Sequence, residues 1–258
     1  MKNNFQNWVS KQRIELIFYL PKLNFFLLMI PILWCIYKLF QEQKDSMIII
    51  LLLVIIVLSF FGIFINNLIR KSAYLMLYEK IDLQKITDYF NYAYSHIPVS
   101  QRKKFNYYCI LNKAQVAFLR GKFEESLQLL NQIKSSEMFS STSDRIKENQ
   151  LYYEFLNYCS LSQFENAELL LDKLSKEYKE SSEFILDILK GNVSDYAFEY
   201  EPHTRLMLIS RSYYQALNLL NANDKSAAKE KFKKIADENP ELFYVRESKK
   251  YLEELENE

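Results

Sequence analysis

The chain has 258 residues, of which 49% are hydrophobic and 16% aromatic, and its formal net charge is +1 at pH 7. Six of the 33 basic and three of the 32 acidic residues precede residue 70, so the part that follows carries a net charge of −2. A slightly acidic domain of this kind does not favour binding to nucleic acid, because nucleic acid binds to basic patches. Glycine occurs at positions 62, 121 and 191 alone, so the chain contains neither a P-loop nor a dinucleotide-binding fingerprint.

Residues 1–22 predict a cytoplasmic segment that lies at the membrane interface. Apolar residues such as Phe5, Trp8 and Leu16 recur at helical spacing, while Lys11 and Arg13 occupy other faces. A basic amphipathic helix of this kind binds lipid surfaces. A simple lead-in to the apolar run that follows explains the pattern equally well.

The first apolar run predicts a transmembrane helix over 23–40. Lys22 and Lys38 stand at its ends, where their ammonium groups can reach the membrane interface while the stems stay buried. Asn24 and Pro31 lie inside the run and leave two alternatives open, a buried core helix and the apolar core of a signal peptide. No small-x-small cleavage site follows, and a second apolar run stands directly behind, so we favour the span.

The second apolar run predicts a transmembrane helix over 47–66. Positions 47–65 carry no charged side chain, and sixteen of these residues are Leu, Ile, Val or Phe. The run reaches roughly 28 Å, close to the ~30 Å hydrocarbon thickness of a bilayer. On the hydrophobicity scale derived from translocon-mediated insertion, placing this run in the membrane is favourable by about 5–10 kcal/mol. Ser59 and Gly62 are small residues on nearly one face and predict a close contact with another transmembrane helix.

The distribution of basic residues predicts a multi-pass protein of the cell membrane with two spans and both termini in the cytoplasm. Four basic residues flank the first span on its N-terminal side and four follow the second span, whereas two border the connector. Basic flanks resist translocation. The three cysteines, Cys35, Cys109 and Cys159, form no disulfide or metal-ligand pattern.

Residues 71–258 predict an all-α cytoplasmic domain. Three segments share one pattern, in which a helix ends at a short polar turn and a second helix places a small residue five positions later. Large apolar residues follow four and seven positions beyond the small one. The turns lie near Gly121, Ser162 and Asn223; the small residues are Ser126, Ala167 and Ala228; the large ones are Leu130 and Ile133, Leu171 and Leu174, and Phe232 and Ile235. Small residues at a fixed place allow antiparallel helices to approach closely.

With these residues the chain resembles the tetratricopeptide repeat (TPR) family. Ala114 and Ala216 match the family's small residue in the first helix, Phe155 replaces it in the middle segment, and Pro240 matches the closing proline. The repeat starts are 41 and 61 residues apart, against the usual 34. The resemblance implies an α-solenoid with repeats at about 107–134, 148–179 and 209–240 and a capping helix at 241–256.

The resemblance also implies a peptide-binding groove lined by the first helix of each repeat. An apolar, aromatic groove suits an amphipathic helix or an extended apolar segment. The groove positions implied by the resemblance lack the Lys and Asn with which some TPR domains bind a C-terminal carboxylate. Packing between neighbouring helices is an equally good explanation for apolar and aromatic residues at these positions. The candidate groove residues are Tyr108, Leu111, Gln115, Tyr152, Leu156, Tyr213 and Leu217.

The sequence predicts neither catalysis nor a cofactor. His96 and His203 stand apart, and no His, Cys or carboxylate cluster has the spacing of a metal site. No small-molecule substrate and no nucleic acid is expected. The leading hypothesis is a membrane-anchored cytoplasmic adaptor that binds a protein or peptide partner next to the bilayer. A peptide-responsive membrane sensor and an assembly factor that acts through its transmembrane hairpin are the alternatives.

Overall fold

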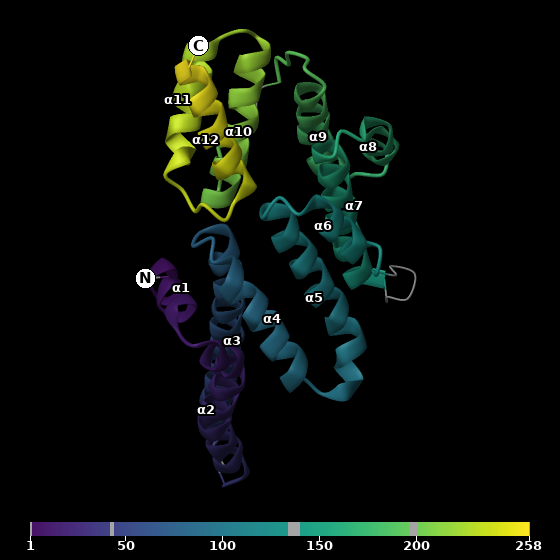
Figure 1. The fold of residues 1–258 in the computed structure, drawn as a ribbon. Helices are drawn as coiled ribbons and strands as arrows, with labels where there is room; N and C mark the ends of the chain where they lie inside the picture. The colour runs from purple at the N-terminus through teal and green to yellow at the C-terminus, as the bar shows by residue number, and fades with distance from the viewer. Residues whose placement is uncertain (1, 42–43, 134–139, 197–200, 258) are drawn as a thin grey trace. The chain divides into compact units, whose positions relative to one another are not determined.

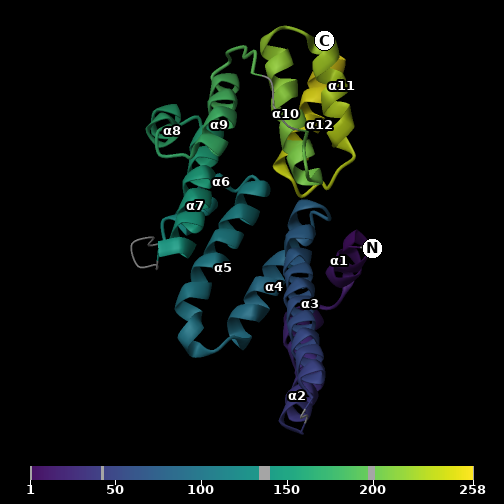
Figure 2. The same cartoon turned by 180° about the vertical axis from the view of Figure 1, so that it is seen from behind.

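The computed structural model describes residues 2–41, 44–133, 140–196 and 201–257, and these residues form helices without a β-strand (Figures 1 and 2). The all-α class predicted from the sequence is therefore confirmed. The helices are α1 (Lys2–Lys11), α2 (Ile14–Gln41), α3 (Asp45–Tyr78), α4 (Leu83–His96), α5 (Val99–Leu119), α6 (Phe123–Leu130), α7 (Ser140–Ser160), α8 (Phe164–Leu171), α9 (Lys176–Leu189), α10 (Arg205–Asn221), α11 (Lys225–Ala236) and α12 (Phe243–Asn257).

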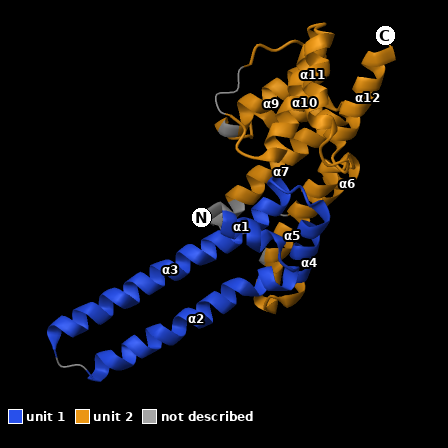
Figure 3. Cartoon of the chain, turned by 90° about the vertical axis from the view of Figure 1, so that its left-hand side faces the viewer, with its two compact units in different colours: residues 1–93 blue, residues 94–258 orange. Residues whose placement is uncertain are grey.

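The chain divides into two compact units, residues 1–93 and 94–258 (Figure 3). The division falls inside α4, so residues 71–93 belong to the first unit, whereas the sequence pattern places the start of the helical domain at residue 71. The reason is that α3 continues to Tyr78 as one uninterrupted helix, beyond the predicted span end at residue 66. A left-handed residue, Ile81 with φ 53°, then turns the chain into α4.

The first unit is built on α2 and α3, which pack side by side as a hairpin (Figure 3). Both helices are long and apolar enough to cross a membrane, and only 6% of the most apolar 18-residue window of each is buried within the structure. Helix α2 begins at Ile14, nine residues before the predicted span, because the lead-in continues the same helix. Helix α1 packs against α3 and buries Val9, while Trp8 stays about half exposed.

The second unit consists of short antiparallel helix pairs. Helix α5 packs on α6, α7 on α8, and α10 on α11, and α9 stands between the second and third pairs in contact with α7, α8 and α10. Helix α9 begins at Lys176 and ends at Leu189, two residues before Gly191. Helix α7 begins at Ser140, inside the stretch 135–144 that has the composition of a loop; positions 135–139 lie outside the described residues.

Four helices of this unit end in the same Schellman turn. The residues with positive φ are Gly121 (74°), Ser162 (58°), Gly191 (87°) and Asn223 (60°). In each turn this residue's N–H bonds the carbonyl three positions back, and the next N–H bonds the carbonyl five positions back, as in Gly121 to Phe118 and Lys122 to Ala117. The three turns predicted from the sequence therefore share one backbone geometry, and Gly191 supplies a fourth.

The small residues of the repeat pattern lie where the paired helices meet. Ser126, Ala167 and Ala228 are fully buried. Ser126 also donates a 2.8 Å hydrogen bond from its hydroxyl to the Ala114 carbonyl on α5, and Asn157 of α7 donates to the Ser126 hydroxyl at 2.8 Å. In the first pair, the small position thus links three successive helices by hydrogen bonds as well as allowing close packing.

Candidate functional site

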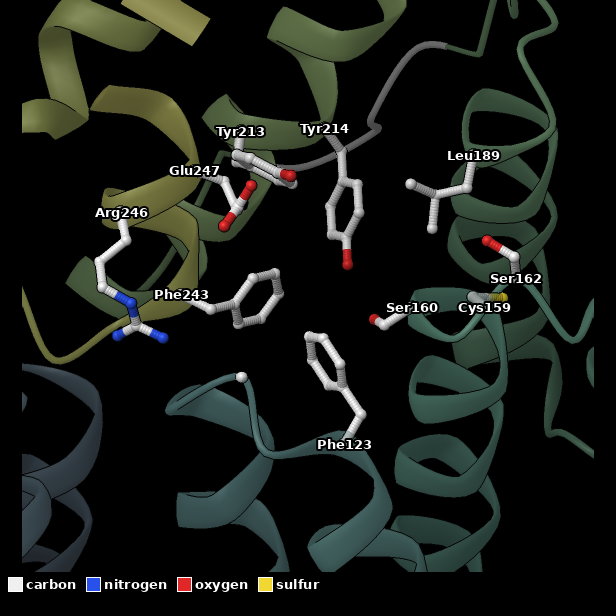
Figure 4. A pocket seen from close by; sticks show the side chains of 11 residues that line it. Phe123, Cys159, Ser160, Ser162, Leu189, Tyr213, Tyr214, Phe243, Arg246 and Glu247 are labelled. Atoms are coloured by element: carbon white, nitrogen blue, oxygen red, sulfur yellow. The ribbon is translucent and has the colours of Figure 1, made fainter. Parts of the chain in front are cut away.

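A cavity of about 290 Å³ lies inside the second unit, where the ends of several helices meet (Figure 4). It is bordered by the turn between α5 and α6, the turn between α7 and α8, the end of α9, and one face each of α10 and α12. Its lining residues are Gly121, Phe123, Cys159, Ser160, Ser162, Leu189, Tyr213, Tyr214, Phe243, Arg246 and Glu247.

The cavity exists because the start of α12 returns to the first turn of the unit. Arg120 pairs with Glu241 through two hydrogen bonds of 2.7 and 3.0 Å, and Arg246 donates to the Arg120 carbonyl at 2.7 Å. The ring of Phe243 lies edge-on to Phe118 at 5.3 Å between centroids. Two segments about 120 residues apart in the sequence are therefore joined, and the helices between them surround the cavity.

Gly121 makes this approach geometrically feasible. Its φ of 74° belongs to the left-handed region that glycine adopts without strain. A Cβ at this position would lie 3.0 Å from the Cβ of Phe243 and 3.1 Å from a guanidinium nitrogen of Arg246. The turn of α5 and α6 and the first turn of α12 thus pack without room for a methyl group.

Buried aromatic rings form one wall of the cavity. Tyr213 and Tyr214 on α10 and Phe243 on α12 line the cavity, and Tyr244 packs against them without lining it. All four rings lie within 6.0 Å of their nearest ring neighbours and are nearly excluded from solvent. Burial raises the pKa of the Tyr213 phenol, and the nearby Tyr251 and Glu247 add to the effect. Burial likewise raises the pKa of Tyr214 far above its usual value. All of these phenols are neutral at physiological pH.

The opposite wall is small and polar. Cys159 and Ser160 come from the end of α7, and Ser162 comes from the turn that follows. The Ser160 hydroxyl donates a 2.8 Å hydrogen bond to the Leu156 carbonyl. Burial raises the pKa of the Cys159 thiol to about 12, although the positive charge of Lys190 works in the opposite direction. Cys159 is therefore a neutral thiol and a weak nucleophile.

The predicted groove positions are only partly brought together. Tyr108, Leu111 and Tyr152 are half-buried, and Tyr152 packs against Tyr178 at 4.6 Å between ring centroids. The remaining four are buried, and the Gln115 amide donates to the Tyr153 hydroxyl at 2.6 Å. Tyr213 is the one candidate groove residue among those that line the cavity; the buried four are Gln115, Leu156, Tyr213 and Leu217.

Most cavity residues carry no local signal in the sequence. Phe123, Tyr214 and Phe243 look like ordinary apolar positions of amphipathic helices, and only the return of α12 places them together. A signal was present in Phe243 and Tyr244, two adjacent aromatic residues at the start of a helix whose other face is charged. Two bulky rings at one helix end indicate a contact beyond the neighbouring helix.

A second candidate contact, between the two apolar helices, involves Gly62 and not Ser59. A Cβ at Gly62 would lie 2.7 Å from a methyl group of Leu28 on α2. Asn24 of α2 donates hydrogen bonds to the Gly62 carbonyl at 3.2 Å and to the Asn66 side chain at 3.0 Å. Ser59 is exposed and donates to the Ile55 carbonyl of its own helix at 2.8 Å.

No group of three or more His, Cys, Asp or Glu side chains in the described ranges is arranged to hold a metal ion. Comparison with protein-family models gives no match, and neither does comparison with curated proteins or with solved structures. The interpretation of the site therefore rests on the geometry and chemistry of the residues described above.

Proposed function

We propose that this protein is a membrane-anchored adaptor, in which α2 and α3 cross the bilayer as a hairpin and the second unit binds a partner protein or peptide beside it. The observation that carries the proposal is the exposure of two long apolar helices, of which only 6% of each apolar window is buried. A core helix of a soluble protein of this composition would be covered by its own chain, whereas lipid covers a transmembrane helix.

The proposed orientation places both termini in the cytoplasm. Its support is the excess of Lys and Arg on the outer flanks of the hairpin over the connector. The polar contact between Asn24, Asn66 and Gly62 supports the hairpin itself, because hydrogen bonds between helices hold transmembrane pairs together where the hydrophobic effect does not.

The proposed binding surface belongs to a TPR-like array. The support is the recurrence of one turn geometry and of fully buried small residues in paired helices. Tyr108 and Leu111 on α5 are the groove positions best suited to contact a partner, because their side chains are half-exposed and the neighbouring Gln115 is already bonded within the unit.

Co-purification of the full chain in a mild maltoside detergent tests the adaptor. We expect a partner that binds saturably and that is lost from the double variant Tyr108→Ala and Leu111→Ala. The control variant Lys113→Ala, which changes an exposed residue of the same helix, should retain it. A stable full chain that captures no partner would refute the adaptor role. Capture that is indifferent to Tyr108 and Leu111 would move the binding surface elsewhere.

The cavity favours a second candidate function, a membrane sensor that responds to a small ligand. Its walls come from helices at both ends of the second unit, so occupancy would change how firmly α12 closes on the turn after α5. A ligand that binds only the folded, closed state raises the apparent stability of the chain. Thermal unfolding with and without candidate ligands distinguishes a sensor from an adaptor that has no ligand.

A further inference from the structure

We propose that the cavity between Phe123, Tyr214 and Phe243 is a binding site for an organic cation, namely an ammonium group carried on a short apolar stem. The proposal concerns the second unit alone and goes beyond the adaptor role. It rests on three features of the lining: the aromatic faces, the direction of the hydrogen-bonding groups, and the placement of the charges.

The aromatic faces come from three different elements. Phe123 projects from the start of α6, Tyr214 from α10 and Phe243 from α12, and their rings surround the same space (Figure 4). Tyr213 lies beside them and contacts Phe243 at 6.0 Å between centroids. Phe123 and Phe243 also contact each other edge-to-face at 5.2 Å between centroids. Aromatic rings that border a partly desolvated space attract a cation through their negative faces, and cages of this kind are how proteins recognise quaternary ammonium groups.

One hydroxyl that faces the space, that of Ser160, is a better acceptor than donor. The Ser160 hydroxyl donates its hydrogen bond to the Leu156 carbonyl, so its oxygen can accept a hydrogen bond from a ligand. The Tyr214 hydroxyl points into the space from the opposite side (Figure 4), and its oxygen accepts a hydrogen bond from the Tyr244 hydroxyl. A ligand that carries N–H or polarised C–H groups therefore finds its acceptor at the Ser160 oxygen.

The charges also favour a cation. Arg246 is the one basic side chain among the described residues that line the cavity, and it turns away from the rings (Figure 4). Its guanidinium donates to the carbonyls of Arg120, Pro240 and Glu241, so it offers little to an anionic ligand. Glu247 supplies a carboxylate beside Tyr213 (Figure 4).

The charges around the cavity do not neutralise this carboxylate strongly. Glu247 pairs with Lys250 of its own helix at 2.7 Å, and both side chains are exposed, at 37% and 64%. Exposed pairs of this kind contribute little and exchange readily. Lys190, near Cys159, pairs with Glu168, and Arg120 pairs with Glu241. A ligand cation therefore competes for Glu247 with one weakly held lysine.

The size of the cavity limits the ligand. Its volume of about 290 Å³ lies just below the usual range of small-molecule sites, which is about 300 to 1,000 Å³. A choline-sized cation or the end of a lysine side chain is within this limit. These two sources share one chemistry, and probes of each kind separate them.

The experiment uses the purified full chain in dodecyl maltoside and three probes. Choline represents a free or lipid-borne quaternary ammonium, n-butylammonium represents a lysine side chain, and 3,3-dimethylbutan-1-ol has the shape of choline without the charge. Titration calorimetry measures binding, and alkylation of Cys159 localises it, because this thiol lines the cavity. Cys109 is a buried thiol of α5 that does not line it, so it reports a general change in stability.

We expect choline or n-butylammonium to bind and the neutral alcohol to bind at least about tenfold more weakly, with Cys159 protected more than Cys109. Tighter binding of choline points to a quaternary ammonium ligand, and tighter binding of n-butylammonium points to a peptide lysine. Three results would overturn the proposal. They are equal binding of the neutral alcohol, equal protection of both thiols, and no binding of either cation at concentrations up to about 10 mM.

Two variants test the named groups. Phe123→Leu keeps an apolar side chain but removes one aromatic face, and Glu247→Gln keeps the shape but removes the charge. Phe123→Leu should weaken cation binding about 5- to 30-fold, the range expected for one desolvated cation–π contact. Glu247→Gln should weaken it about 2- to 5-fold, because this carboxylate is partly exposed to solvent. Glu253→Gln, an exposed position on the same helix outside the cavity, should leave binding unchanged. Because no partner protein is present, these results are independent of the adaptor role.

Discussion

Replacing Gly121 with alanine should destabilise the second unit more than the same change at Gly191. Both glycines follow a helix and have positive φ, 74° and 87°, so alanine meets the same backbone strain at each. A Cβ at Gly191 meets no atom within 4 Å, whereas a Cβ at Gly121 meets Phe243 at 3.0 Å and Arg246 at 3.1 Å. The difference between the two variants therefore measures the contact between α12 and the first turn.

The expected magnitudes follow from these two contributions. An alanine in the left-handed conformation costs about 1–2 kcal/mol, which is the whole effect expected for Gly191→Ala. Overpacking at a tight contact adds about 1–3 kcal/mol, so Gly121→Ala should lower the free energy of unfolding by about 2–5 kcal/mol. Arg246 can move its flexible end, but the Phe243 Cβ belongs to a buried residue and cannot.

Urea titration of the full chain in maltoside micelles provides the assay. Pulse alkylation of Cys159 at each urea concentration reports the opening of the second unit, because this thiol is 2% exposed when the unit is folded. A local probe is needed since a chain with two units need not unfold in one step. Linear extrapolation hardly resolves differences smaller than about 0.5 kcal/mol. If the free energies of unfolding of Gly121→Ala and Gly191→Ala agree within this limit, the closure of α12 on the turn is refuted.

Three further predictions concern other parts of the chain. Ser162→Gly should stabilise the second unit by about 0–1 kcal/mol in the same urea assay, because it removes the strain of a left-handed backbone at a non-glycine residue. Asn223→Gly should stabilise it less, since Asn tolerates this conformation. Destabilisation by Ser162→Gly would contradict the observed turn geometry. The Cys159 thiol should stay protonated in the folded chain up to pH 10, because burial raises its pKa to about 12; the chemical shift of a ¹³C-labelled Cys159 Cβ measures this, and titration near pH 9 would show a solvent-accessible thiol. Asn24→Leu should weaken the hairpin by about 0.5–2 kcal/mol in detergent unfolding, and the exposed neighbour substitution Asn67→Leu should not; equal effects would rule out the polar contact.

Local features of the fold were predictable from the sequence because each depends on a few neighbouring residues. Gly121, Ser162 and Asn223 were predicted as turns, and all three adopt positive φ. The small residues were predicted to lie between paired helices, and Ser126 and Ala167 are fully buried. A turn residue and a small residue at fixed spacing determine a helix pair without reference to the rest of the chain.

The cavity was not predictable because it depends on contacts between distant segments. Arg120 and Glu241 are 121 positions apart, and helical periodicity contains no information about which helix end returns to which turn. Helix α12 was predicted as a cap on the last pair. It does pack on α10 and α11, and in addition its first turn contacts the turn after α5. The same closure buries Tyr213, which the repeat pattern placed in a groove.

The division of the chain shows a related limit. A charge pattern locates the end of an apolar run, but it does not show where a compact unit ends. Helix α3 extends to Tyr78, past the last apolar residue of the run, and residues up to Ala93 group with the hairpin. Ser59 and Gly62 looked equivalent in sequence, yet only Gly62 faces α2, because a separation of three residues places them about 60° apart around the helix.

The most direct test of the membrane hairpin is the sidedness of three positions in sealed membranes. A reporter that is active only in the cytoplasm and one that is active only outside are each fused after residue 11, within the connector at Lys44, and after Glu258. We predict cytoplasmic activity at both ends of the chain and outside activity at the connector. A reporter at Glu258 that is active only outside, or opposite sides for the two ends, would contradict the proposed arrangement.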